Sequence, residues 1–407
     1  MAPPSRGKAA YAGIEESAQL GWRTLDGDGN TIQNNQGSFP QDDSVFAAKL
    51  PFGDPMHPDV VALREHMEEN NGIPGLTVID GQAVLEDDEL AKRAAAIFHR
   101  DGFVAVSRAL VGDDLTRMQE ASDRQVREMM ALDPHRVGNR GSHRYSFGGA
   151  SHTGHCSHVA EWAELLFDNE VTRRIMKHIF DSENYICRGG GGDFCLAGSV
   201  EYQGLHQDMG DPVGNADPNE EPALGIRDGP PPACTCNYAM QDLTPVNGPI
   251  RQVPGTHNHR APGGRFNAPN VQDEPEWMKM STVLVPAGSC VMRDVRCWHG
   301  GTPNLSQEER CLPNAEFLAP WFWENMRHSM PREIYDKLSP HGQLTCRYIV
   351  ADEDEHIPVG YRMNAEAKGG LEHAFHESDE ASPLSYEEDS ASIWSDFVAR
   401  KTQASKL

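Results

Sequence analysis

Residues 196–210, "LAGSVEYQGLHQDMG", join a β-prone run to a histidine and an aspartate two positions apart. In a strand, side chains at i and i+2 point to the same face, so His206 and Asp208 can reach a common ion. The spacing alone is weak, because His57–Asp59 and His99–Asp101 repeat it in a chain with 18 histidines. The first copy lies in a Pro-rich stretch and the second at the end of a predicted helix. Only the pair at 206 and 208 enters a β-rich region, and it predicts two ligands of a metal site.

Beyond residue 184 the chain has the pattern of many short strands. Its β-prone runs are separated by Gly, Pro and Asn, and "PVNGP" (245–249) and "VPAGS" (285–289) have the composition of hairpin turns. Short strands with turn residues between them are typical of an all-β barrel or sandwich.

The preceding region is predicted to be helical. Apolar residues at positions 90, 94, 97 and 98 recur at the spacing of an amphipathic helix, and "FVAV" (103–106) follows as a short strand. A second helix is predicted after Gly112-Asp113-Asp114, and a third over 161–180 with a break near Asp168. Helices followed by strands predict an α+β fold in which helices buttress the barrel.

These patterns divide the chain into three parts. Residues 1–50 are rich in Gly, Asn, Ser and Asp without sustained periodicity, so we expect a loosely ordered N-terminal arm. The main domain is expected over 51–340, with a helical buttress at about 86–182 and the β-barrel at about 184–320. Residues 341–407 are expected to form a C-terminal extension.

Composition excludes several classes of partner. The 407 residues include 36 basic and 61 acidic side chains, for a formal net charge of −25. Such a surface repels phosphate backbones and anionic lipid, so neither nucleic acid nor a membrane is expected as a partner. No apolar run reaches the roughly 18–20 residues that cross a bilayer, and the first residues lack the apolar core of a secretory signal. The nine cysteines form no CxxC pair, which predicts reduced thiols in a soluble intracellular protein.

The last three residues, Ser405-Lys406-Leu407, match the carboxyl-terminal address that the peroxisomal import receptor reads. The stretch before them is acidic and rich in serine, which should leave the tripeptide reachable. We therefore expect a peroxisomal location, with the import receptor as a protein partner.

The predicted metal site needs a third ligand. Divalent iron centres that activate oxygen use two imidazoles and one carboxylate on a single face. His299 ends a β-prone run just before a Gly-Gly-Thr-Pro turn, and Arg310 follows eleven residues later. An arginine directed into a barrel is costly unless a carboxylate or phosphate satisfies it, and a co-substrate carboxylate would do so. The alternatives are a turn histidine at 299 and a surface arginine paired with Glu308 or Glu309.

Four segments carry a resemblance to a known family. They are "FHRDGFVAV" (98–106), "LHQD" (205–208), "VNGPIRQVPGTH" (246–257) and "PAGSCVMRDVRCWHGGTPN" (286–304). Over roughly residues 90–320 the chain resembles the phytanoyl-CoA dioxygenase family of iron(II)/2-oxoglutarate-dependent oxygenases. The resemblance implies a double-stranded β-helix, also called a jelly roll. It also implies iron(II), 2-oxoglutarate and O2 as cofactors, with ascorbate as the reductant.

The resemblance assigns roles to individual residues. His206, Asp208 and His299 would bind iron(II), and Arg310 would bind the distal carboxylate of 2-oxoglutarate. The family often has a small hydroxyl residue just after the distal histidine, where this chain has two glycines and then Thr302. Further co-substrate contacts are expected at Gln203, Thr302 and Asn237.

The carboxylate at position 208 bears on the reaction. Related halogenating enzymes replace it with a small residue that makes room for chloride, so Asp208 predicts hydroxylation or another oxidation of a C–H bond. 2-Oxoglutarate and O2 would be converted to succinate and CO2. The substrate is expected to be a small organic molecule, either a fatty acyl-CoA or a specialised metabolite. Two alternatives stay open, a non-catalytic metal- or ligand-binding barrel and a zinc hydrolase with the same ligands.

Residues 143–158, "HRYSFGGASHTGHCSH", contain four histidines. His152, His155 and His158 are three apart, a spacing compatible with one side of a helical turn and with a second metal site. The Gly and Ser content favours instead a polar loop over the barrel mouth. In that case two aromatic residues of the loop would contact substrate, Tyr145 and Phe147.

Overall fold

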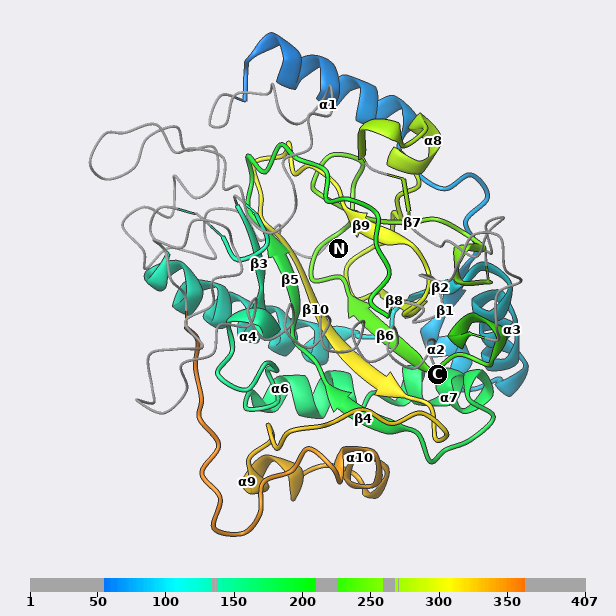
Figure 1. Ribbon diagram of the computed structural model, residues 1–407, viewed down its shortest axis with the longest axis vertical. Coiled ribbons are helices and arrows are strands. Elements are labelled where there is room, and N and C mark those ends of the chain that lie inside the picture. Colours follow the sequence, from blue (N-terminus) through cyan, green and yellow to red (C-terminus); the bar gives the residue numbers. More distant parts are fainter. Residues whose placement is uncertain are drawn as a thin grey trace, which may run out of the picture.

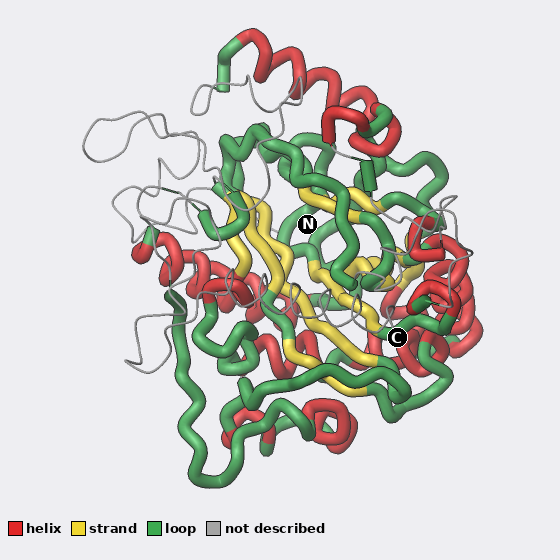
Figure 2. The backbone as a smooth tube through the Cα atoms, viewed as in Figure 1, coloured by secondary structure: helices red, strands yellow, loops and turns green. Residues whose placement is uncertain are grey.

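The computed structural model shows a mixed α and β fold, in which a central sheet is flanked by helices (Figure 1). Strands run through the middle of the molecule and helices lie around them (Figure 2). The predicted N-terminal arm and the C-terminal tripeptide lie outside the described residues, so both stay predictions. The structure describes residues 55–133, 136, 138–141, 143–209, 225–258, 268–269 and 271–362.

Helix α3 (Asp88–Asp101) begins and ends where its sequence predicts. The Asp87 side chain accepts a hydrogen bond of 2.9 Å from the backbone two residues on, which caps the first turn. The helix ends at Gly102, whose left-handed φ of 84° suits a residue without a Cβ. A Cβ there would lie 2.6 Å from the ring of His257, so space also requires glycine. The predicted helix and the strand after it, β2 (Phe103–Ser107), are confirmed.

The two other predicted helices are present. Helix α4 (Gly112–Leu132) is present, and it starts at Gly112, before the predicted start after Asp114. The third region forms α6 (Ala160–Trp162), a π-helical turn and α7 (Glu170–Ile179), and the interruption falls at Asp168 as predicted. The Asn169 side chain caps α7, so a new helix starts here. Among the described helices, none has both the length and the apolarity needed to cross a membrane.

Ordered structure starts earlier than the helical buttress predicted at about residue 86. Helix α1 (Pro58–Asn70), strand β1 (Val78–Asp80) and helix α2 (Gly81–Val84) all precede α3. Strand β1 has three residues and is held by parallel pairing with β2, which no local pattern reveals. The remaining short helices are α5 (Phe147–Ala150), α8 (Glu276–Lys279), α9 (Arg332–Tyr335) and α10 (Pro340–Cys346).

The main sheet has eight strands in the order β1-β2-β8-β6-β10-β5-β3, with β4 paired to β10. All of its pairings except β1–β2 are antiparallel. A second sheet consists of β7 and β9. The bounds not yet given are β3 (Arg144–Ser146), β4 (Ile186–Gly189), β5 (Gly192–Cys195), β6 (Ala233–Tyr238), β7 (Ile250–Gln252), β8 (Cys290–Asp294), β9 (His299–Gly301) and β10 (Arg310–Leu318).

The outer face of the main sheet packs against helices. Met292 of β8 and Phe317 of β10 belong to one buried cluster with Phe98 of α3 and Trp162 of α6. Tyr361, near the end of the described chain, belongs to the same cluster. Part of the chain beyond residue 340 therefore contributes to this core, and the predicted domain division stays a prediction.

The inner face of the main sheet turns toward the second sheet. Val291 of β8 and Leu312 of β10 pack with Ile250 of β7 in a smaller apolar cluster. Side chains alternate between the two faces along each strand, so Arg293 and Arg310 lie on the same face as Val291 and Leu312. Charged side chains as well as apolar ones therefore lie on the face of the main sheet that is turned toward the second sheet.

Candidate active site

Two histidines far apart in the chain lie side by side. The backbones of His206 and His299 form an antiparallel bridge, with N–H···O distances of 3.0 and 2.9 Å. The centroids of their rings are 4.2 Å apart. His299 is the first residue of β9, so the second sheet fixes its position. The backbone bridge to His299 then fixes the position of His206. The structure thus brings together the two imidazoles that the sequence singled out.

The third member of this group is Asp208. Its Oδ1 lies 3.4 Å from His299 Nε2 and 4.0 Å from His206 Nε2, and one ligand atom from each residue lies within 4.8 Å of the others. Each imidazole Nδ1 lies 3.0 Å from a backbone carbonyl oxygen, that of Gly204 or Cys297. A carbonyl only accepts, so Nδ1 carries the proton and Nε2 keeps its lone pair. The three side chains therefore present the donor set that fits a divalent metal.

Electrostatics keep His206 and Asp208 in their ligand forms at neutral pH. Burial and the neighbouring His299 lower the pKa of His206 to about 3, so its imidazole is neutral. Burial opposes ionisation of Asp208, but the guanidinium of Arg293 holds the pKa of its carboxyl well below the usual range. Neutral imidazole and ionised carboxylate are the forms that bind a metal.

Arg310 is buried on the inner face of β10 and is not the surface residue of the alternative interpretation. It is 4% exposed, and its Nε donates to the Gly248 carbonyl at 2.7 Å. Within the described part of the chain, no salt bridge joins it to a carboxylate. Burial lowers the pKa of Arg310, and the guanidinium of Arg144 also lowers it. A bound anion would counter both effects.

Arg144 is a site residue that the sequence patterns did not reveal. Its Nη2 donates to the backbone carbonyls of Glu201 and Thr302, and its buried Nε has no partner among the described residues. In the sheet register, Cys195 of β5 lies opposite both Arg144 and Arg310. The two guanidinium groups are neighbours for this reason, and only strand pairing could have shown it.

Gln203 and Thr302 lie beside Arg144. Gln203 Oε1 accepts from the Gly301 N–H at 3.0 Å. A Cβ on Gly301 would lie 2.5 Å from Arg144 Nη1, so the small residue leaves room for that guanidinium. The Thr302 side chain is fully buried, and its hydroxyl donates to the Pro249 carbonyl at 2.7 Å. The position of Gln203 suits a co-substrate contact, whereas the Thr302 hydroxyl already has a structural partner.

Asn237 lies on the inner face of β6, opposite Asn314 of β10. It is 7% exposed, and its Nδ2 has no hydrogen-bond partner within the described chain. A buried amide donor without a partner costs free energy, and a polar group of a bound molecule would remove that cost. The co-substrate role of Asn237 stays a prediction, and this observation favours it.

The prediction that Tyr145 and Phe147 contact substrate is wrong. Both side chains are fully buried. Tyr145 stacks on Phe194 with ring centroids 4.5 Å apart, and its hydroxyl lies 2.9 Å from Asp133 Oδ2. Residues 144–150 form β3 and α5 rather than a loop over the barrel mouth. Both aromatic residues belong to the core between the sheet and the helices.

The three histidines at 152, 155 and 158 do not gather into a second metal site. Two groups of potential metal ligands exist among the described residues, and neither contains these histidines. Each of them has a different neighbour: Arg362 for His152, Gly189 for His155 and the ring of Tyr361 for His158.

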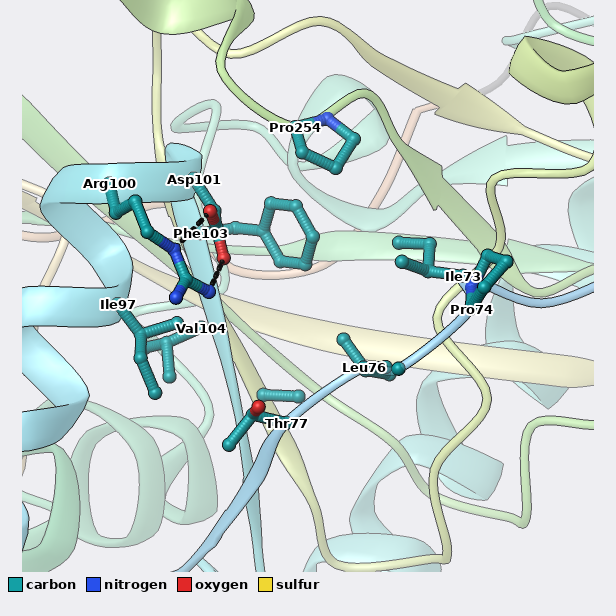
Figure 3. Close-up of a pocket in the computed structure, with 12 residues that line it drawn as sticks. Ile73, Pro74, Leu76, Thr77, Ile97, Arg100, Asp101, Phe103, Val104 and Pro254 are labelled. Carbon is teal, nitrogen blue, oxygen red and sulfur yellow. Dashed lines mark hydrogen bonds and ion pairs between the residues drawn. The ribbon is translucent and has the colours of Figure 1, made fainter.

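A pocket of about 210 Å³ is drawn in Figure 3. It is lined by residues 73–77, by the end of α3 and the start of β2, and by Pro254. The ion pair between Arg100 and Asp101 lies at one side of it. None of the predicted iron or co-substrate residues lines this pocket, so it does not belong to the candidate active site.

Comparison with known protein families identifies the chain. The model of the family described as "Phytanoyl-CoA dioxygenase (PhyH)" matches residues 98–311, more than half of the sequence. The chain belongs to the phytanoyl-CoA dioxygenase family. The match includes the three grouped side chains and Arg310. Family membership makes the protein an enzyme of the iron- and 2-oxoglutarate-dependent oxygenase class, with iron(II), 2-oxoglutarate and O2 as its cofactors.

Similar solved structures include two α-ketoglutarate-dependent enzymes from nogalamycin biosynthesis, the epimerase SnoN and the carbocyclase SnoK, and also AviO1 from Streptomyces viridochromogenes Tue57. Each is 19% identical to this family member, with TM-scores of 0.40, 0.39 and 0.38 in that order. The alignments cover 57%, 56% and 57% of this chain, and 84%, 83% and 96% of the other chains. Likeness at this level says nothing about the reaction of this family member.

Proposed function

We propose that this family member oxidises a C–H bond of a small organic metabolite, with conversion of 2-oxoglutarate and O2 to succinate and CO2. The observation that carries the proposal is the convergence of His206, Asp208 and His299, in a fold that also buries Arg310 on the inner face of the main sheet. Two imidazoles and one carboxylate are the donor set of oxygen-activating iron sites. We interpret the two sheets around this group as the double-stranded β-helix of the family.

In this proposal the iron ligands are His206 Nε2, His299 Nε2 and Asp208 Oδ1. Bound iron(II) and 2-oxoglutarate supply the oxidising chemistry. Arg310 binds the distal carboxylate of 2-oxoglutarate, because its guanidinium is buried and no carboxylate of the described chain satisfies it. Arg144 adds a second positive charge close to Arg310.

Charged side chains near the site favour a free metabolite over a fatty acyl-CoA. Burial opposes the charge of Arg188, but Glu316, Glu324 and Asp208 together raise the pKa of its guanidinium, so it lies within electrostatic reach of the site. Arg188 Nη1 is 2.7 Å from Glu316 and its Nε is 2.9 Å from Glu324. A cation held by two carboxylates is poorly suited to bind the phosphates of coenzyme A. The net charge of −25 also repels these phosphates.

Exposed tryptophans next to a cluster that adjoins the site favour a substrate with an apolar or ring-containing part. Phe322 packs against a buried cluster that includes Val295, whose carbonyl accepts from the Asp208 N–H at 2.9 Å. On either side of Phe322, Trp321 and Trp323 are 52% and 57% exposed. Large aromatic side chains left exposed beside a site are typical of binding surfaces.

The test is succinate release by the full-length protein with Fe(II), 2-oxoglutarate and O2. One panel contains free metabolites with aromatic or alicyclic rings, and the other contains fatty acyl-CoA thioesters. We expect coupled oxidation of a free metabolite and no chlorinated product when chloride is present, since Asp208 occupies the place that chloride would need. Coupling to acyl-CoA thioesters alone would contradict the substrate class.

The same assay separates the other functions that the sequence left open. Turnover supported by zinc without O2 would favour a hydrolase over an oxygenase. Binding of metal without succinate release from any substrate of either panel would favour a non-catalytic barrel. Oxygen consumption that requires both Fe(II) and 2-oxoglutarate would exclude both.

A further inference from the structure

Arg293 lies beside the metal-binding group, at a depth where a charged side chain needs a partner. It belongs to β8 and lies between Phe103 of β2 and Thr235 of β6 in the register of the main sheet. Its chain neighbour Met292 points to the helix-side core, so strand alternation turns Arg293 to the inner face. The Arg293 side chain is 5% exposed. Burying a guanidinium is costly unless a carboxylate or several carbonyls accept its protons.

The partner of Arg293 is Asp208. Arg293 Nη2 donates to Asp208 Oδ2, whereas Oδ1 faces the Nε2 atoms of the two imidazoles. The two oxygens of this carboxylate therefore have different neighbours. The Asp208 main chain is anchored as well, because its N–H donates to the Val295 carbonyl at 2.9 Å. Both anchors lie at the end of β8, so the carboxylate cannot rotate without losing a charge-assisted hydrogen bond.

We propose that Arg293 is a positioning residue that reserves Oδ2 of Asp208, so that this carboxylate offers a metal one oxygen and not two. The inference rests on the proposed function. A carboxylate that binds a metal through both oxygens takes two coordination positions. Together with two imidazoles and chelating 2-oxoglutarate, it would fill all six positions of an octahedral ion. Arg293 thereby keeps one position open beside the co-substrate, which O2 needs. Outer partners of metal-binding carboxylates commonly orient them in this way.

The positive charge of Arg293 gives the proposal a distinctive consequence. A guanidinium close to a cation site opposes metal binding through Coulomb repulsion. Removal of Arg293 should therefore leave metal affinity intact or raise it, while a small ligand loses its position on the metal beside 2-oxoglutarate. A residue that only stabilised the fold would lower the affinities for metal and for 2-oxoglutarate when removed.

The experiment uses the full-length protein, stripped of metal and then loaded with Co(II) as a spectroscopic probe. Calorimetric titrations give the Kd of Co(II) and, under anaerobic conditions, the Kd of 2-oxoglutarate for the Co(II)-loaded protein. Nitric oxide, a neutral stand-in for O2, is then added to the protein that holds both, and the Co(II) absorption spectrum is recorded. We expect Arg293→Met to bind Co(II) at least as tightly as wild type and still to bind 2-oxoglutarate, but to lose most of the spectral change that nitric oxide causes in wild type. Arg293→Lys, which keeps the charge and one donor, should fall between them.

Arg188→Met is the matched control. Arg188 lies within electrostatic reach of Asp208 but pairs with Glu316 and Glu324, so its removal should leave both Kd values and the response to nitric oxide unchanged. A wild-type response to nitric oxide in Arg293→Met would overturn the inference. A parallel loss of Co(II) and 2-oxoglutarate affinity would overturn it too, since that marks a structural role.

Two further measurements keep the outcome unambiguous. If circular dichroism shows that Arg293→Met does not fold, the same criteria apply to Arg293→Gln, which keeps a neutral donor of similar reach. Wild-type protein that binds Co(II) but no 2-oxoglutarate would contradict the proposed function itself, and the inference with it. That failure appears before any variant is made and is therefore distinguishable from failure of the inference alone.

Discussion

The backbones of His206 and His299 hydrogen-bond to each other in both directions, at 3.0 and 2.9 Å, so main-chain pairing places the two imidazoles. This bridge does not depend on either side chain. A substitution of one ring therefore removes a ligand and leaves the backbone pairing in place. Loss of activity in such a variant reports on the metal site and not on the fold.

His206→Ala should abolish most of the 2-oxoglutarate turnover. We expect a decrease of more than about 100-fold, because loss of only an outer partner of a ligand already costs roughly 10–100-fold. Succinate release with Fe(II) measures it. His328→Ala is the control, since this exposed histidine pairs with Glu355 outside the site, and its activity should equal that of wild type. Near-normal turnover in His206→Ala would refute the assigned ligand set.

A bound metal should stabilise the folded protein. A ligand at 100 times its Kd adds about 2.7 kcal/mol to the free energy of unfolding when it binds only the folded state. We expect Mn(II) to do so in wild type and to have no effect on Asp208→Ala, as measured by urea denaturation. Equal stabilisation of both proteins would place the metal elsewhere, for example at the exposed group of His328, Asp352 and Glu355.

Arg310→Met should weaken 2-oxoglutarate binding without unfolding the protein. A hydrogen bond to a charged group contributes about 1.5–3 kcal/mol, so we expect roughly a 10–100-fold higher Kd for 2-oxoglutarate. Arg310 is a buried cation with no carboxylate partner among the described residues, so its replacement by an apolar side chain should leave the melting temperature unchanged or higher. Calorimetry and thermal unfolding measure the two quantities. Arg310→Lys keeps the charge but loses the planar guanidinium that can donate two parallel hydrogen bonds to a carboxylate. Its Kd for 2-oxoglutarate should therefore be intermediate.

Tyr145→Phe should lower the free energy of unfolding and leave the catalytic activity unchanged. The change removes the hydrogen bond between the Tyr145 hydroxyl and Asp133 and leaves a buried carboxylate oxygen with one donor fewer. We expect a loss of about 1–3 kcal/mol in the free energy of unfolding, measured in urea. An altered KM for 2-oxoglutarate or for the organic substrate, at unchanged stability, would show that Tyr145 reaches the site after all.

Glu274→Gln should be among the most destabilising changes near the site. Glu274 and Arg251 are both fully buried at their side chains and pair with each other, and Glu274 also accepts from the Leu205 N–H at 3.3 Å, next to His206. Breaking a buried ion pair by removing one charge costs about 3–5 kcal/mol. Denaturant unfolding measures the loss. Glu276→Gln, at an exposed carboxylate paired with a histidine, should stay within about 0.5 kcal/mol of wild type.

Several features were predictable because they depend on neighbours in the chain. The bounds of α3 follow from the Asp87 cap and from Gly102, and the break at Asp168 follows from the capping residue after it. His206 and Asp208 were distinguishable from the other His-x-Asp pairs because only they follow a β-prone run. By contrast, β1 escaped prediction because its three residues are ordered by pairing with β2.

The sequence by itself determined the types of the ligands and their spacing, and the family motifs around them. Only the tertiary structure decided that Arg144 and Arg293 join the site, and that Tyr145 faces the core instead. The physical reason is that the face of a strand residue depends on the register with its partner strands, and a shift of one residue moves every side chain to the opposite face. The sequence states which residue types are present and how far apart they are. The register between strands depends on the packing of the whole sheet.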